Sequence, residues 1–292
     1  MKSRISIPGA QEKPRRSIDP TFYLILPLLV LLIFFMVVPV FRIFALSFFD
    51  PDFTIKHYMK FFQAGIYLQI LLRTLVISLM VSVCCLIAGY PVSYLMADVS
   101  PKTAKILIIL VILPLWTGIL VRTYAWMVLL GRQGLVNKLL IYLDLVAEPI
   151  KLLYTTKAVV LAMVQILLPL MILPLYATMK GIDRDLLKAS KILGAGPLRT
   201  FWRIFLPLST PGILAGFTLV FIISIAFFIT PALVGGRKDI MIAMLIESQI
   251  TTLLNWGFAA ALSLILMTMT LIIIGLFHKF IGINRFVGSG DT

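Results

Sequence analysis

The sequence predicts an all-α integral membrane protein with six transmembrane helices. The prediction depends on the composition, on long uncharged runs, and on the placement of the cations. Of the 292 residues, 61% are hydrophobic and 13% are charged, and the mean hydropathy is +1.06. Soluble domains are nearer half apolar and a quarter charged. The composition therefore excludes a water-soluble globular protein.

Six apolar runs are long enough to span a bilayer, which takes about 20 helical residues because every backbone polar group must be bonded inside the segment. We place the spans at about residues 20–48, 68–97, 104–131, 156–179, 204–236 and 250–279. They form one transmembrane domain, about residues 20–282, between the tails 1–19 and 283–292. The first run exceeds the ~7–15-residue core of a signal peptide, so we expect it to be retained.

The cations predict the orientation of the chain. Lys and Arg number 26 against 12 Asp and Glu, which gives a net charge of +14. On so apolar a chain this excess indicates loops beside anionic membrane lipid rather than a nucleic-acid partner. With both termini in the cytoplasm, the inner segments carry fifteen Lys and Arg residues and the outer segments carry eight. Because inner loops are richer in cations, we expect both termini to be cytoplasmic.

The connection between the fourth and fifth spans, residues 180–203, is longer and more charged than a turn requires. Its charges suit a helix dipole, with acids first and lysines later: Asp183, Asp185, Lys188 and Lys191. Its apolar and small residues form one stripe at helical spacing: Leu186, Ala189 or Ser190, and Leu193. Gly194 is expected to end the helix. A helix of about ten residues is marginal in water, so it must dock on a partner or lie on the inner leaflet.

The same segment resembles a loop of the permease subunits of binding-protein-dependent ABC importers. Their pattern is Glu-Ala-Ala, three residues, Gly, nine residues and Ile-x-Leu-Pro. The chain has Lys188-Ala189-Ser190, Gly194 and Ile204-Phe205-Leu206-Pro207 at the same spacing. It departs from the pattern at Lys188, where the family has Glu, and at Ser190, where the family has Ala.

This resemblance implies the permease core of a type I ABC importer, with a cytoplasmic coupling helix between the fourth and fifth spans. In that family the helix sits in a groove of the ATP-hydrolysing subunit. The residues expected to couple the chain to the ATPase are Asp183, Asp185, Leu186, Lys188, Ala189, Ser190, Leu193, Gly194, Ile204, Leu206 and Pro207.

Other motifs resemble the spermidine/putrescine-type permeases. They are Leu113-Pro114-Leu115-Trp116, Val121-Arg122-Thr123-Tyr124-Ala125-Trp126, Leu168-Pro169-Leu170-Met171 and the run from Thr230 to Gly236. The resemblance implies a subunit of the bacterial inner membrane that imports a polyamine or related solute. The implied partners are a second permease subunit, two ATP-binding subunits and a periplasmic binding protein. A heterodimer of permeases is favoured over a homodimer. ATP and Mg would belong to the partner ATPase, and this chain would have no catalytic residue, cofactor or metal.

The candidate substrate-pathway residues are Trp116, Arg122, Tyr124, Trp126 and Glu247. An arginine at mid-bilayer costs about 2.5–3.5 kcal/mol, so Arg122 should face protein or water. It either lines or braces the passage, or it is an interfacial arginine that extends outward among aromatic side chains. Glu247 would attract a polycation at the entrance, but we favour an exposed acid flanking a short helix.

Two other functions remain alternatives. A secondary transporter or channel is disfavoured because the spans contain no carboxylate to bind a coupling ion. An intramembrane enzyme would need a Ser/Lys pair, paired Asp or a His cluster, and the spans contain none. No Gly-x-x-x-x-Gly-Lys-Ser/Thr sequence is present for binding ATP. Cys84 and Cys85 are adjacent in an apolar run and make no disulfide framework.

The fifth span contains residues that affect helix packing. Gly212 and Gly216 form a Gly-x-x-x-Gly pair that permits close helix contact, either within one subunit or between two. Pro207, Pro211 and Pro231 are expected to kink this span or to mark its ends.

Overall fold

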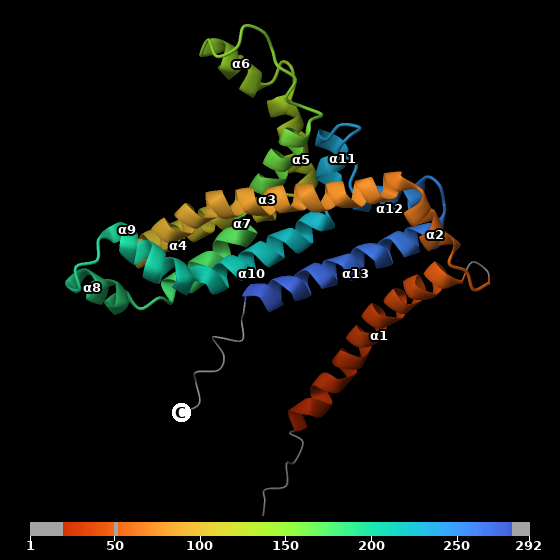
Figure 1. The fold of residues 1–292 in the computed structure, drawn as a ribbon, viewed down its shortest axis with the longest axis horizontal. Coiled ribbons are helices and arrows are strands. Elements are labelled where there is room, and N and C mark those ends of the chain that lie inside the picture. The colour runs from red at the N-terminus through yellow and green to blue at the C-terminus, as the bar shows by residue number, and fades with distance from the viewer. Residues whose placement is uncertain (1–19, 50–51, 282–292) are drawn as a thin grey trace, which may run out of the picture. The chain divides into compact units, whose positions relative to one another are not determined.

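The computed structural model describes residues 20–49 and 52–281, and the regular elements of these residues are helices (Figure 1). The chain divides into two units, Met1–Ala45 and Leu46–Thr292. Helix α1 (Pro20–Phe48) accounts for the described part of the first unit. It is predominantly apolar over Leu26–Phe48, where Arg42 is the one charged residue, and this composition suits a membrane span.

The core of the second unit is a bundle of three helices, α3 (Gly65–Asp98), α7 (Thr156–Lys180) and α10 (Leu206–Ile225). Their contact residues are apolar and fully buried, among them Val81, Met163, Met171 and Val220. With 34 residues, α3 is about 50 Å long, enough to cross the hydrocarbon with some tilt.

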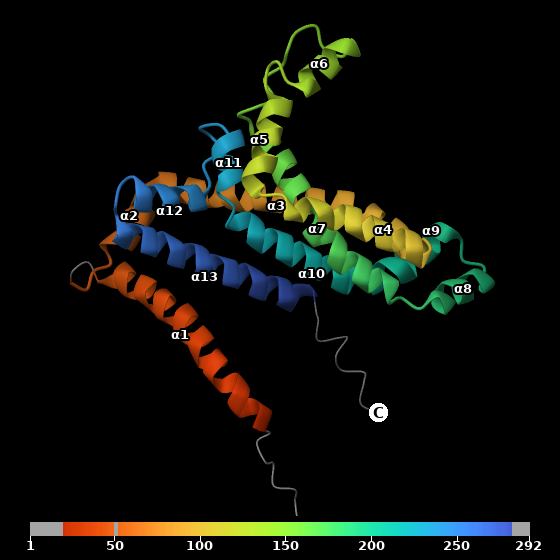
Figure 2. The same ribbon diagram turned by 180° about the vertical axis from the view of Figure 1, so that it is seen from behind.

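Short helices lie at the two ends of this bundle (Figures 1 and 2). At the end where α3 and α7 finish are α8 (Arg184–Ile192), α9 (Pro197–Thr200) and the π-helix η2 (Phe201–Phe205). At the other end are α2 (Lys56–Gln63), α11 (Ile229–Val234) and α12 (Ile242–Thr251), and α13 (Trp256–Ile281) starts there. The segment from residue 180 to residue 203 is thus separated from the candidate Glu247 by the length of the bundle.

The third apolar run, expected as a span over residues 104–131, is not one straight helix but a bent pair of helices. Helix α4 (Pro101–Ile112) continues as the 3-10 helix η1 (Leu113–Trp116), and α5 (Ile119–Leu130) continues toward α6 (Leu135–Tyr142). The two halves meet at 92°. The break follows from Pro114, which has no N–H to donate, and from the extended backbone of Thr117 and Gly118. In both views α5 and α6 extend away from the bundle (Figures 1 and 2).

The fifth and sixth runs are also shorter than predicted. The expected span over 204–236 ends at Ile225, and α11 is a separate helix. Pro231 lies in the first turn of α11, where a proline's missing N–H removes no hydrogen bond within the helix, so it favours the start of a new helix here. The expected start of the sixth span at residue 250 falls in α12, and α13 begins only after Asn255, whose side chain accepts from the N–H of Phe258 at 3.1 Å. Five helices of the described chain are apolar and long enough to span, or six with the bent pair.

The glycine pair of the fifth span is used inside this subunit. A Cβ at Gly212 would lie 2.7 Å from Oγ1 of Thr178 and one at Gly216 would lie 2.8 Å from Sδ of Met171, both on α7. The two glycines therefore let α10 approach α7 closely, which decides between the two packing roles that the sequence left open.

Candidate functional site

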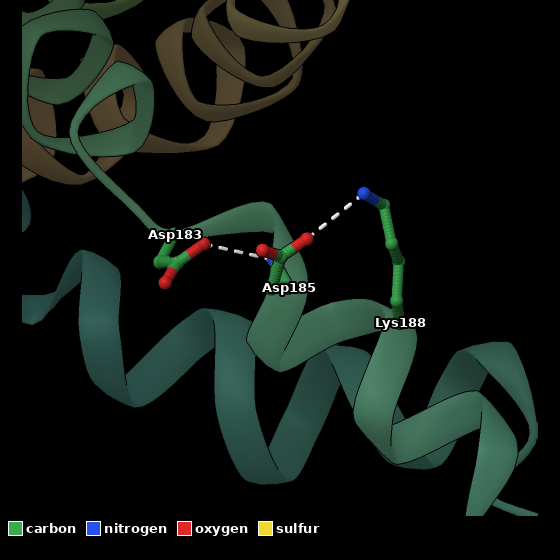
Figure 3. A network of polar contacts seen from close by, with 3 residues as sticks. All are labelled: Asp183, Asp185 and Lys188. Atoms are coloured by element: carbon green, nitrogen blue, oxygen red, sulfur yellow. Dashed lines mark hydrogen bonds and ion pairs between the residues drawn. The ribbon is translucent and has the colours of Figure 1, made fainter.

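The helix predicted between the fourth and fifth spans is present as α8. The Asp183 side chain accepts a hydrogen bond from the Asp185 N–H at 2.9 Å and so caps the helix. Nζ of Lys188 donates to Oδ1 of Asp185 at 2.8 Å (Figure 3). Gly194 follows the helix with a φ of +78°, a left-handed conformation that glycine adopts without strain.

Arg184, which the sequence analysis did not select, attaches the start of α8 to the end of α3. One guanidinium nitrogen, Nη2, donates to the carbonyl oxygen of Ala97 at 2.7 Å, and Nη1 lies 3.3 Å from Oδ1 of Asp98. The last carbonyl groups of a helix have no partner within the helix, so this arginine satisfies one of them. The sequence did contain a signal for Arg184: it is a cation in the first turn of α8, where the helix dipole disfavours positive charge unless a partner compensates it.

Ser190 attaches α8 to α9 and so to the start of the fifth span. Its side chain is 5% exposed, and its hydroxyl lies 2.9 Å from that of Thr200. The same hydroxyl donates to the carbonyl oxygen of Leu187 at 2.9 Å. The Ser190 hydroxyl is therefore turned toward its own subunit, so Ala189 is the more exposed of the two residues that the sequence analysis offered for the stripe. Alanine, the usual family residue at this position, has no hydroxyl to make this contact.

The opposite face of α8 is open and apolar. Leu193 is 86% exposed, and Leu186 and Ala189 are also exposed. These three residues line a 400 Å³ cavity together with Ile204, Arg199 and Arg203. This open face is the one that the sequence analysis expected to dock on a partner or to lie on the inner leaflet.

The Ile204-x-Leu206-Pro207 motif forms the junction between η2 and α10. Pro207 has no N–H, and its ring conflicts with the carbonyl group four residues earlier. The backbone takes a π-turn here, in which the N–H of Leu206 donates to the carbonyl oxygen of Phe201. Such π-segments inside helices frequently accompany functional sites.

The structure brings only some of the pathway candidates together. Arg122 and Trp126 are one helical turn apart on α5, and Nε1 of Trp126 donates to Oε1 of Gln165 on α7 at 3.3 Å. Nε and Nη1 of Arg122 are buried, and no residue in the described ranges accepts a hydrogen bond from them. Tyr124 is exposed, and Trp116, at the bend of the third run, is 87% exposed.

Glu247 lies apart from this group, on α12. It is exposed, and its Oε1 accepts a hydrogen bond from Oγ1 of Thr251 in the same helix at 3.0 Å. This geometry fits the exposed acid that the sequence analysis favoured. The nearby Asp239, by contrast, is buried, and its carboxylate accepts hydrogen bonds from the Thr156 hydroxyl and from the Gly236 N–H.

No metal site is visible in the part of the chain that the structure describes: no three His, Cys, Asp or Glu residues gather there. Cys84 is exposed and Cys85 is buried, and neither forms a disulfide. The site therefore consists of an exposed apolar face on α8 and, on α5 and α7, of Arg122 and the hydrogen-bonded pair Trp126–Gln165.

In the described residues, a bundle of apolar spans carries an open amphipathic helix at one end, which is the architecture expected of a membrane transport subunit. Residues 21–280 match the family described as the inner membrane component of binding-protein-dependent transport systems, and the chain belongs to this family. It is therefore a multi-pass inner-membrane permease of an ABC importer, as the sequence predicted.

Relatives and solved structures agree with this assignment. The spermidine/putrescine transport system permease protein PotB of Haemophilus influenzae is 36% identical over 256 residues, which are 85% of this chain and 89% of that protein. PotB of Escherichia coli is 36% identical over 75% of this chain and 80% of that protein. The fold is similar to a chain of the bacterial alginate ABC transporter, solved with an alginate pentasaccharide-bound periplasmic protein. The TM-score is 0.76, the identity is 16%, and the match covers 93% of this chain and 96% of that chain.

Proposed function

We propose that this permease forms, with a second and different permease subunit, the passage for a polyamine or related small solute. A periplasmic binding protein delivers the solute, and two ATP-binding subunits, which hold ATP and Mg, drive its import. Both termini are cytoplasmic in this proposal, so α8 faces the ATP-binding subunits. The names and the 36% identity of the two PotB relatives support the solute class.

The observation that carries the coupling role is the way α8 is attached. It makes polar links to α3 through Arg184 and to Thr200 through Ser190, while its apolar face stays open. A push on the open face would therefore reach α3 directly and α10 through α9 and η2. These are two of the three helices of the central bundle, so a movement of α8 changes the packing of the spans.

In this proposal the open face of α8 inserts into a groove of the ATP-binding subunit. Leu186, Ala189 and Leu193 supply the contact, and Asp183, Asp185 and Lys188 keep the helix formed. Gly194 turns the chain back toward the membrane. Ile204, Leu206 and Pro207 give the π-turn at which the force enters α10.

The passage itself would run past the bend of the third span. Trp116, Tyr124 and Trp126 give it aromatic side chains, and Arg122 braces it. A polyamine is a polycation, which Arg122 would repel, so this arginine positions neighbouring groups and does not bind the solute. Recognition of the charge would then depend mainly on the binding protein.

The test uses the complex of both permeases and the ATP-binding subunits, purified through a tag on this chain. Leu193→Asp places a charge in the proposed contact and should remove the ATP-binding subunits from the complex and abolish uptake of labelled spermidine. The control is Leu253→Asp, because Leu253 is exposed at the other end of the bundle. The control should retain the ATP-binding subunits. Equal retention in both variants would disprove the docking role of α8, and ATP-dependent uptake of a different solute would disprove the polyamine assignment.

A further inference from the structure

The face of α8 that carries its cations borders a second cavity, of 340 Å³. Small-molecule sites have volumes of about 300–1,000 Å³. Arg184, Lys188 and Lys191 line it, at positions i, i+4 and i+7, which lie on one side of a helix. The apolar stripe used in the proposed docking lies on another side of the same helix.

The walls of this cavity come from the ends of membrane-spanning helices. Tyr94 and Ala97 belong to the last turns of α3, Met179 to the last turn of α7, and Phe201 and Phe205 to η2. A tyrosine near the end of a span, such as Tyr94, is typical of the level of the lipid headgroups. The cavity therefore joins an apolar wall at membrane depth to a cationic rim.

The charges on the rim favour an anion. Among the described residues, Asp98 is the single acid that lines the cavity, and it is paired with Arg184 at 3.3 Å. Lys188 is paired with Asp185, but both side chains are more than 70% exposed. Such a pair contributes little to stability, so Lys188 can leave Asp185 for another anion. Lys191 has no ionic or hydrogen-bond partner among residues 20–49 and 52–281.

We infer that this cavity binds the headgroup of an anionic phospholipid of the inner leaflet, with Lys191 as its main phosphate contact. The inference rests on the cytoplasmic placement of α8 in the proposed function. Basic pockets between the inner ends of membrane helices suit such headgroups, and the inner leaflet is negatively charged. The lipid would fill the space between α8 and the ends of α3 and α7, and would therefore stiffen the connection through which α8 acts on the spans.

The test measures which lipid stays with the purified complex of permeases and ATP-binding subunits. The complex is extracted from membranes of equimolar phosphatidylcholine and phosphatidylglycerol, and the retained lipids are counted by native mass spectrometry. We expect phosphatidylglycerol to be enriched in the wild type, and Lys191→Gln to lower the enrichment about fivefold, because one lysine beside an anionic surface contributes about that factor. Lys191→Arg should retain the enrichment, since it keeps the charge.

The matched control is Lys180→Gln, which removes a lysine that is exposed in the last turn of α7 and does not line the cavity. It should leave the enrichment unchanged. An equal loss in the control, or no loss with Lys191→Gln, would overturn the inference. So would enrichment only in the absence of the ATP-binding subunits, which would mean that these subunits fill the cavity. Leu193→Asp distinguishes the two proposals, because it should lose the ATP-binding subunits and still retain phosphatidylglycerol.

Discussion

The two ends of the central bundle are built differently. At one end, α8 is joined to the bundle through Arg184 and Ser190 and leaves Leu193 exposed. At the other end, α5 and α11 share a hydrogen bond between the hydroxyls of Thr123 and Thr230, 3.0 Å apart and buried. That end also has an apolar cluster of its own, formed around Leu130, Ala158 and Val234.

This difference indicates which end moves. A segment with few buried apolar contacts can shift at low cost, whereas a segment packed in an apolar cluster resists displacement. Helix α8 is the first kind and the α5–α11 wall is the second. In the proposed function, α8 would therefore receive the movement and the α5–α11 wall would shape the passage.

The strongest test of this division is Arg122→Leu, at the rigid end. Burying a charged group without a partner is costly, so in the proposed function Arg122 finds its acceptor within the assembled transporter or its passage. We expect uptake by the reconstituted complex to fall about tenfold or more, equivalent to about 1.4 kcal/mol in a barrier. ATP-binding subunits should still be retained, because Arg122 is far from α8 along the bundle.

Arg132→Leu is the control for the Arg122 variant, because Arg132 is exposed in the loop after α5. Its uptake should stay near the wild-type rate. Wild-type uptake by Arg122→Leu would instead support the alternative of an interfacial arginine that extends outward. Loss of the ATP-binding subunits from the Arg122→Leu complex would show that a change at this end of the bundle also affects α8.

The next test concerns the contact between α7 and α10, which joins the two ends. Gly212→Ala would place a Cβ 2.7 Å from Oγ1 and 2.8 Å from Cβ of Thr178, so one helix must shift. Overpacking of this kind costs about 1–3 kcal/mol. Gly275→Ala, in α13, has no atom within 4 Å of the new Cβ and should be stabilising by about 0.5–1 kcal/mol. Thermal unfolding of the purified permease in detergent measures both; a stable Gly212→Ala would mean that α7 and α10 lie further apart.

Local signals in the sequence predicted the α8 end well. Asp183, Gly194 and Pro207 act on their own backbone within a few residues, so their effects are encoded in short spacings. The bend of the third span was missed, although Pro114 and Gly118 mark it, because hydropathy measures the apolar length of a run and not its direction. The pairs Ser190 with Thr200 and Thr123 with Thr230 were also missed. Each joins hydroxyl groups on different helices, and no local pattern specifies such contacts.

The smallest expected effect is that of Lys188→Glu, which restores the family's usual residue in α8. The Lys188–Asp185 pair is exposed, and pairs of this spacing contribute only about 0.2–0.5 kcal/mol to a helix. The new glutamate would also face Asp185 across one helical turn, so the thermal stability of the purified permease should fall slightly, and less at high salt. Lys188→Gln is the control that removes the attraction without adding repulsion. Its thermal stability should lie between those of the wild type and Lys188→Glu. A large loss of stability would mean that α8 depends on this pair, whereas a loss confined to binding of the ATP-binding subunits would show that Lys188 meets an acidic partner there.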